Sequence, residues 1–115
     1  MTTSREQREL CARFGAVPSP VAEDEVVGIS LSVRGKVVPV NGLRHPPKGG
    51  TTGWYIWAGE ELESNVDFFK ALHVAHLQGW CPAALKFLAL PPGYRFLIAG
   101  DCEDVWFDPA LLEVK

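Results

Sequence analysis

Hydrophobic and polar residues alternate with a period of two along the segment that begins at Glu25. Val27, Ile29, Leu31 and Val33 fall on one side of this pattern, and glycine or serine residues occupy the positions between them. Successive side chains of a β-strand point to opposite faces of a sheet, so strict alternation is typical of a strand with one buried face. The pattern predicts a half-buried strand over residues 25–33.

The next strong pattern is the aromatic run in residues 53–59, which is bounded by glycine at both ends. Aromatic side chains pack well on a pleated surface, and glycine permits tight turns, so the run indicates a strand. Its alternation places Trp54, Ile56 and Ala58 on one face and Tyr55 and Trp57 on the other. Because both faces are apolar, we expect this to be the core strand of the domain.

The segment between these two strands carries weaker signals. Residues 34–36 predict a turn, and residues 37–40 predict a returning strand that Pro39 limits to an edge or a bulge, since proline has no amide donor. Asn41-Gly42 is a typical turn pair. Residues 44–52 show neither period and predict a surface loop, where binding residues are often found.

The second half of the chain predicts two helices and a hairpin. In residues 68–80, apolar residues and histidines recur at three-and-four spacing, which predicts a helix. Cys81-Pro82 ends it, and Pro82 begins a second helix in which Ala84, Leu85 and Leu88 are the candidate buried residues. Residues 94–99 and 104–107 predict the two strands of a hairpin, and residues 110–112 a short final turn. The fold class is therefore α+β, a single domain with a mostly antiparallel sheet covered by the two central helices.

The N-terminal region predicts a peripheral helix joined to the domain by a linker. Thr3 and Glu6 have the spacing of a capping box, and Gly15 can end the helix near Phe14. The apolar stripe of this helix is thin, so we expect it to lie on the domain surface or to fray. Prolines at 18 and 20 stiffen the following segment. We therefore divide the chain into an N-terminal helix and proline-rich linker, residues 1–24, and the α+β domain, residues 25–115.

Several short motifs together resemble those of a known family. They are Gly53-Trp54, the run Ala58-Gly59-Glu60-Glu61, Pro82 with Leu85 and Leu88, and the run from Leu90 to Phe96. Over roughly residues 25–112 the chain resembles bacterial immunity protein family thirty-three, formerly a domain of unknown function. Its members are predicted antidotes to polymorphic toxins. The resemblance implies an α+β fold and a toxin partner, and it carries over no catalytic residue.

Composition and charge exclude several classes of protein. With 115 residues, 47% hydrophobic and 22% charged, the chain has the composition of one globular domain. No apolar run approaches the roughly 20 residues needed to span a bilayer, and the N-terminus lacks the apolar core of a signal peptide, so we expect a cytoplasmic protein without a membrane partner. The three cysteines are an odd number without CxxC spacing, which argues against a disulfide framework.

The net charge of −3 is unevenly distributed. Residues 1–48 hold seven Lys or Arg against five Asp or Glu, a balance of +2, whereas residues 49–115 hold four against nine, a balance of −5. Nucleic acid is not an expected partner, because phosphate binding requires a basic patch and the aromatic half of this chain is acidic. A partner protein with a basic surface fits better.

Candidate catalytic and metal chemistry is sparse. His73 and His76 share a face of the predicted helix, and with His45 or Cys81 they are a conceivable zinc set, although no second ligand pair has the usual spacing. We interpret them as packing residues and expect no bound metal and no cofactor. In residues 48–52 the lysine precedes the glycines, unlike a phosphate-binding loop. The acidic residues lack the context of a paired acid and base, and no serine or cysteine has a nucleophile motif, so we expect a protein that is not an enzyme.

The candidate partner-binding surface combines an aromatic side chain with acidic residues. Trp57 points away from Trp54 and stands near an acidic strand end, and an aromatic anchor with a charged rim is typical of interface hot spots. The candidate contact residues are Trp57, Glu60, Glu61, Asp101, Glu103 and Asp104.

Three functional hypotheses follow. The first is an immunity protein that neutralises a cognate toxin by occlusion, without catalysis. The second is a small-molecule or carbohydrate-binding module in which Trp54, Trp57 or Trp106 forms a stacking platform. The third is a small metal-dependent enzyme that uses the three histidines. The sequence leaves open the identity of the toxin and the oligomeric state.

Overall fold

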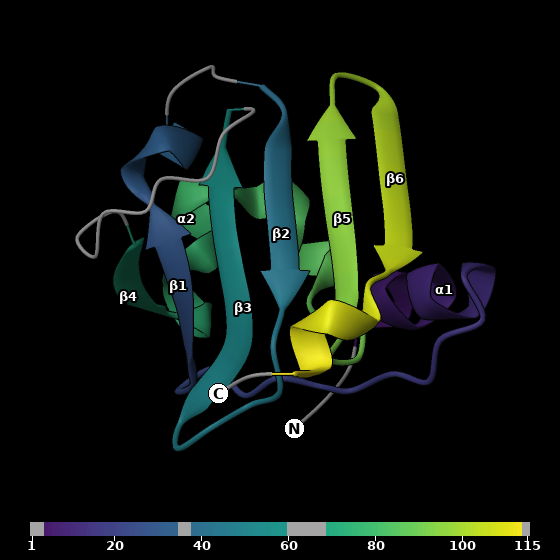
Figure 1. Ribbon diagram of the computed structural model, residues 1–115. Helices are drawn as coiled ribbons and strands as arrows, with labels where there is room; N and C mark the ends of the chain where they lie inside the picture. Colours follow the sequence, from purple (N-terminus) through teal and green to yellow (C-terminus); the bar gives the residue numbers. More distant parts are fainter. Residues whose placement is uncertain (1–3, 35–37, 60–68, 114–115) are drawn as a thin grey trace.

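Six strands form one mixed sheet in the computed structural model, which describes residues 4–34, 38–59 and 69–113 (Figure 1). The strands are β1 (Val26–Ser30), β2 (Val40–Arg44), β3 (Thr51–Ala58), β4 (Phe69–His73), β5 (Tyr94–Ala99) and β6 (Cys102–Phe107). Their order across the sheet is β4-β1-β3-β2-β5-β6. β1 and β3 are parallel, and every other neighbouring pair is antiparallel. The predicted α+β class with a mostly antiparallel sheet is confirmed.

The short helical segments lie on both faces of the sheet but unequally. α1 (Arg5–Arg13), α2 (Leu77–Trp80) and the 3₁₀ segments η2 (Val74–His76) and η3 (Pro82–Phe87) supply residues to the main core on one face, and α2 lies behind the sheet in Figure 1. The 3₁₀ segment η4 (Pro109–Leu112) lies on the opposite face, in front of the sheet in the same view. We call the side of the main core the covered face and the other side the open face.

β3 has the two apolar faces that its sequence predicts. Trp54 and Ile56 lie in the main core, whereas Trp57 belongs to a smaller cluster on the open face. The indole N–H of Trp54 donates to the carbonyl oxygen of Leu88 at 2.9 Å, which satisfies the polar atom of this buried ring. The prediction that β3 is a core strand with both faces apolar is confirmed.

The first predicted strand is shorter than its alternation suggests. β1 ends at Ser30, and the chain then forms the 3₁₀ segment η1 (Leu31–Arg34), so Leu31 is 58% exposed instead of buried. The side chain of Ser30 accepts from the amide of Ser32 at 3.1 Å. Serine side chains that bond nearby backbone in this way compete with a strand ladder, which explains the early end.

β2 was the least accurate part of the prediction. Asn41-Gly42 is not a turn but the middle of β2, and β2 is an interior strand between β3 and β5. A Cβ atom on Gly42 would overlap the ring of Phe96, which stacks on Phe87 with centroids 4.4 Å apart. Glycine is required here for close packing and not for a turn. Residues 35–37 of the predicted turn lie outside the described residues.

The predicted helix over residues 68–80 is only half correct. Residues 69–73 form β4, which pairs antiparallel with β1 from Val26 to Ser30. The free edge of β1 has backbone groups that need partners, and this tertiary pairing outweighs the helical spacing. The chain becomes helical only from Val74, through η2 and α2.

The C-terminal third follows the prediction closely. The hairpin of β5 and β6 is confirmed, although β6 begins two residues earlier than expected, because the turn uses only Gly100 and Asp101. Pro82 stands at the start of a helical segment as predicted, and Ala84 and Leu88 are fully buried. The final turn is present as η4.

The N-terminal helix is present and contributes to the main core. Its cap is Ser4, whose side chain accepts from the amide of Gln7 at 3.1 Å, and not the predicted Thr3, which lies outside the described residues. Leu10 and Cys11 are buried in the main core, so α1 is more than a surface attachment. The linker is also held, because the Ser19 amide donates to the Ala89 carbonyl at 2.6 Å.

Arg44, which the sequence placed in a loop, is a buried connector on the covered face. The residue is 2% exposed, and its guanidinium donates to the carbonyl oxygens of Thr52 (2.8 Å), Ser19 (2.9 Å) and Leu90 (2.8 Å). Burial lowers the pKa of Arg44 to about 10, and the Glu25 carboxylate opposes part of this shift. The side chain is therefore charged at neutral pH and joins the linker, β3 and the segment after η3.

Candidate partner-binding surface

One row of paired residues crosses the open face from β1 to β6. Gly28 pairs with Tyr55, Tyr55 with Leu43, Leu43 with Arg95, and Arg95 with Trp106. Directly paired residues lie on the same face of a sheet, so these residues share the open face, with buried Leu43 in the middle of the row. Tyr55 and Trp106 are 39% and 40% exposed, which places a large aromatic side chain towards each end of the row.

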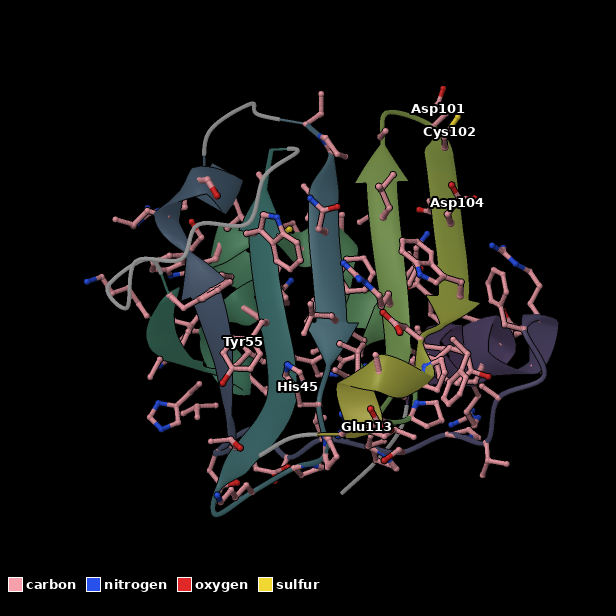
Figure 2. The ribbon with its side chains drawn as sticks, viewed as in Figure 1. His45, Tyr55, Asp101, Cys102, Asp104 and Glu113 are labelled. Atoms are coloured by element: carbon pink, nitrogen blue, oxygen red, sulfur yellow. The ribbon has the colours of Figure 1, made fainter. Side chains whose placement is uncertain are left out.

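A shallow hollow surrounds the Tyr55 end of this row. It has a volume of about 190 Å³ and is lined by Leu43, His45, Tyr55 and Phe69. The Tyr55 ring lies over Gly28, where a Cβ atom would overlap it, and it meets the rings of His45 and Phe69 edge-on at 5.7 and 5.2 Å. Figure 2 shows His45 beside Tyr55. The rings are fixed by their neighbours, so this end of the face is largely preformed.

His45 also ties the hollow to the C-terminal segment. Its Nδ1 lies 3.0 Å from the carbonyl oxygen of Leu111, within hydrogen-bonding distance. Leu111 belongs to η4 and packs with Leu43 and Trp57 in the smaller apolar cluster. η4 therefore covers part of the open face and borders the hollow.

The Trp106 end of the row carries a stacked cation. The Arg95 guanidinium lies 5.6 Å from the Trp106 ring centroid, and its Nη1 is 3.3 Å from Oδ2 of Asp108. The Nε–H of Arg95 is buried and meets no acceptor among the described residues. The positive charge of Arg95 is thus paired with Asp108, and the exposed indole of Trp106 stacks on this paired guanidinium.

Trp57 is not the exposed anchor that the sequence suggested. It is 3% exposed, because Leu111 of η4 and Phe69 of β4 pack around it in the smaller cluster. Its indole N–H is buried and, within the described part of the chain, has no acceptor. The alternation correctly placed Trp57 on the face opposite Trp54, but it carried no information about η4. A binding contribution from Trp57 stays a prediction.

The predicted acidic residues do not form one cluster. Glu103 points to the covered side, where its carboxylate binds the Lys86 ammonium at 2.6 Å. Asp104 lies on the open face in the row of Trp57, Asn41 and Leu97, three strand spacings or roughly 14 Å from Trp57. Asp101 is exposed in the hairpin turn, beside Cys102 and Asp104 in Figure 2. Glu60 and Glu61 lie outside the described residues.

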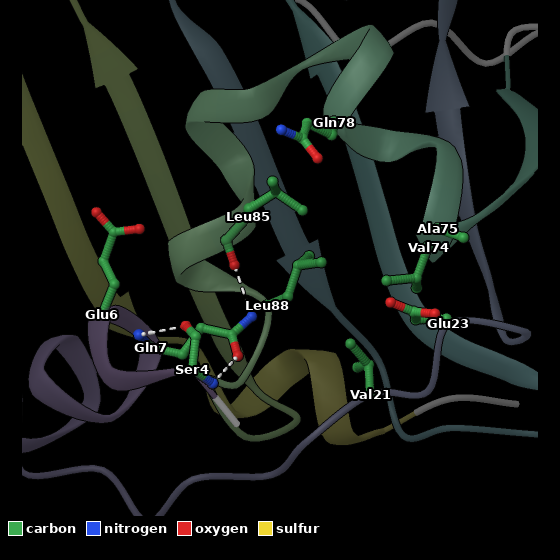
Figure 3. Close-up of a pocket in the computed structure, with 10 residues that line it drawn as sticks. All are labelled: Ser4, Glu6, Gln7, Val21, Glu23, Val74, Ala75, Gln78, Leu85 and Leu88. Carbon is green, nitrogen blue, oxygen red and sulfur yellow. Dashed lines mark hydrogen bonds between the residues drawn. The ribbon is translucent and has the colours of Figure 1, made fainter. Parts of the chain in front are cut away.

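A larger hollow lies on the covered side, between α1, the linker and the helical segments (Figure 3). Its volume is about 500 Å³, and its lining mixes apolar side chains with Glu6, Gln7 and Glu23. At one side of the hollow, the side-chain amide nitrogen Nε2 of Gln7 donates to the Leu85 carbonyl oxygen at 2.8 Å, which couples α1 to η3. Because this bond bridges two packed elements across the hollow, we interpret the hollow as a packing groove.

The candidate metal ligands are not brought together. His45 is committed to the contact with Leu111, whereas His73 ends β4 and His76 ends η2, with ring centroids 6.2 Å apart. Among the described residues, no group of three or more His, Cys, Asp or Glu side chains is placed to hold a metal ion. The shared helical face predicted for His73 and His76 is wrong, because β4 replaces the first half of that helix.

The cysteines differ in their surroundings. Cys11 and Cys81 are buried, and burial raises the pKa of both thiols, whereas Cys102 is exposed in β6. A raised pKa keeps the buried thiols protonated and unreactive at neutral pH. The two buried thiols therefore lack the environment of an activated nucleophile.

Two exposed aromatic residues were absent from the predicted partner-binding set: Tyr55, which was not a site candidate, and Trp106, which was named only as a stacking platform in the second hypothesis. Their signal was present in the alternation, since Tyr55 shares the face of Trp57 and Trp106 stands in the last predicted strand. The tryptophan platform of the second hypothesis is reduced to Trp106, because Trp54 and Trp57 are buried. In the portion of the chain that the structure describes, no helix is long and apolar enough to cross a membrane.

Comparison with known proteins yields one match. The family model of the Imm33-like domain matches residues 6–108, which include α1 and all six strands. Comparisons with curated proteins and with solved structures find no match. Because the match covers most of the 115 residues and agrees with the resemblance to immunity protein family thirty-three, the chain belongs to the Imm33-like domain family.

Proposed function

We propose that this protein is an immunity protein that binds a cognate bacterial toxin in the cytoplasm and neutralises it by occlusion, without catalysis. The observation that carries the proposal is the family match over residues 6–108. The site geometry supports it, because the described residues offer a preformed aromatic surface but no metal-ligand group, and the two buried thiols are not activated. Such a surface is suited to protein binding.

The open face has the composition of a protein-binding surface. Exposed Tyr55 and Trp106 are of the residue types that dominate binding energy at interfaces. Asp101 and Asp104 stand beside this face and have no ion-pair partner among the described residues. We propose that these aromatic residues anchor the toxin and that the acidic residues steer its basic surface. From the sequence, Trp57 was also predicted as an anchor, and Glu60, Glu61 and Glu103 as steering residues.

The exposed aromatic residues distinguish the open face from the groove of Figure 3, whose lining residues include no tyrosine, tryptophan or phenylalanine. Because aromatic residues are enriched at protein interfaces, this difference favours the open face as the toxin-binding surface.

The test is a titration of the cognate toxin domain, for which the product of an adjacent gene is the first protein to examine. The toxin activity is measured at increasing amounts of the purified immunity protein. Occlusion predicts a linear fall that reaches zero at one equivalent, because each molecule blocks one toxin. Complete inactivation at a small fraction of an equivalent would instead indicate turnover, and no inhibition at several equivalents would refute the proposal.

Two variants locate the binding surface within the same assay. Trp106→Ala removes an exposed aromatic side chain and is expected to raise the Kd of the complex by at least about tenfold, mainly through faster dissociation. Asp104→Lys is expected to slow association and to reduce its dependence on salt. Glu9→Lys makes the same charge change on α1, where the Glu9 side chain is 65% exposed, and serves as the matched control.

A further inference from the structure

β6 is the last strand of the sheet and leaves one long edge open. Within the described part of the chain it pairs only with β5, in an unbroken register from Ala99 with Cys102 to Tyr94 with Phe107. Figure 1 shows β6 at the edge of the sheet, with no strand beyond it. An open edge presents backbone donors and acceptors to which another strand can add.

The register identifies the backbone groups on that edge. Antiparallel pairs alternate between those that exchange hydrogen bonds and those that do not. The Asp108 amide donates to the carbonyl of its partner Gly93 at 2.7 Å, so every second pair counted from this one exchanges hydrogen bonds. The backbone N–H and C=O groups of Cys102, Asp104 and Trp106 therefore point toward β5. The N–H and C=O groups of Glu103, Val105 and Phe107 therefore point outward.

β6 has only one of the devices that usually protect an edge strand, the acidic side chains of Glu103 and Asp104. Its six residues include no proline and no lysine, and its register contains no bulge. Protected edges typically carry such residues or irregularities. The edge is instead flanked on both faces by exposed aromatic side chains, with Trp106 at 40% and Phe107 at 48% exposure.

The charges along the edge select the kind of strand that can add. Glu103 is paired with Lys86 and Asp108 with Arg95, which leaves Asp101 and Asp104 without an ion-pair partner among the described residues. Two copies of this edge would bring unpaired carboxylates into one interface, where like charges repel. A strand that carries lysine or arginine would pair with them.

We propose that the β6 edge accepts an extended, basic segment of the cognate toxin as a seventh strand. This inference rests on the proposed function and specifies its binding mode. Backbone hydrogen bonds to Glu103, Val105 and Phe107 provide the pairing, as in other cases of strand addition. Asp101 and Asp104 select basic side chains, and Trp106 and Phe107 contact the side chains on the two faces of the added strand.

A matched pair of substitutions at one position tests the pairing. Glu103→Pro and Glu103→Ala both remove the ion pair with Lys86, but only proline removes the outward N–H. The ladder to β5 does not use this N–H, so both variants are expected to fold, which thermal unfolding checks. With the toxin domain that the wild-type protein inhibits in the titration as the probe, the Kd of the proline variant is expected to be at least about tenfold higher than that of the alanine variant.

Hydrogen exchange on the wild-type protein provides a second measurement that does not depend on the variants. The amides of Glu103, Val105 and Phe107 are expected to exchange rapidly in the free protein and to become protected in the complex. Unchanged exchange at all three amides in a formed complex, or equal Kd values for the two folded variants, would overturn the inference and leave the proposed function intact.

Two further outcomes are separable. If the wild-type protein alone is a dimer that Glu103→Pro makes monomeric, the edge belongs to a second copy of this chain and the inference is wrong. If the wild-type protein neither binds nor inhibits the toxin domain, the proposed function fails and the inference fails with it.

Discussion

Replacement of Arg44 by methionine is expected to destabilise the protein strongly although it leaves the open face untouched. Methionine fills a similar volume but donates no hydrogen bond. The carbonyls of Thr52, Ser19 and Leu90 would lose donors at 2.8, 2.9 and 2.8 Å. A buried acceptor left without a donor costs about 1–3 kcal/mol, so the three together cost about 3–9 kcal/mol.

Part of this loss is recovered because a buried charge is also removed. Arg44 is 2% exposed, and taking its charged group out of water costs several kcal/mol. The net loss for Arg44→Met is therefore expected to be about 2–4 kcal/mol. Arg44→Lys is expected to lose a similar amount, because a single ammonium cannot reproduce the planar fork that reaches all three carbonyls.

Urea unfolding of the purified variants measures these values. Arg5→Met is the control, since Arg5 forms an exposed ion pair with Glu9 and its loss is expected to change stability by less than about 0.5 kcal/mol. If Arg44→Met unfolds cooperatively within that same margin of the wild type, the buried connector does not hold the linker to the sheet and the reasoning is refuted.

Other predictions concern packing and exposure. Gly42→Ala is expected to lose about 1–3 kcal/mol by overpacking Phe96, whereas Gly79→Ala, with open space at its Cβ position in α2, is expected to gain up to about 1 kcal/mol; urea unfolding measures both. In the folded protein only Cys102 is expected to react rapidly with a thiol reagent, and the other two thiols should react on unfolding, as reagent counting checks. A chain that begins at Val21 is expected to lose at least about 3 kcal/mol of unfolding free energy, because it lacks the buried face of α1, and an unchanged urea midpoint would contradict this.

Elements with strong local patterns could be predicted from the sequence. β3 and the hairpin of β5 and β6 combine alternation with glycine-containing turns, and Pro82 fixes the start of η3. In these segments local preference and tertiary packing agree, so the pattern is sufficient. The fold class followed from the same segments.

Other elements depend on partners that are distant in the sequence. Residues 69–73 become a strand because β1 offers them an edge, and Asn41-Gly42 becomes a strand interior because Phe96 needs the space above a glycine. The linker looks stiff and detached in the sequence, yet Arg44 holds it from 25 residues away. No local period records such contacts, which explains why Arg44 was placed in a loop.

The candidate site also combines residues that the local pattern predicted correctly with residues whose exposure depends on distant contacts. Asp101 and Asp104 were predicted as contact residues and are exposed at the hairpin end of the open face. Trp57 was predicted to be exposed, but η4 covers it, and the placement of η4 on that face follows from packing rather than from periodicity. Tyr55 is exposed instead, although it is the immediate neighbour of buried Trp54.

The alternation of the strands separates the residues that stabilise the fold from those proposed to bind the toxin. In β2, Gly42 and Arg44 point to the covered face and hold the core, whereas Leu43 points to the open face. In β6, Asp104 and Trp106 point to the open face, and the side chains of their neighbours point to the covered one. Substitutions at Asp104 and Trp106 can therefore change recognition at little cost in stability. This separation allows a binding defect in a folded Trp106→Ala variant to be assigned to the surface itself.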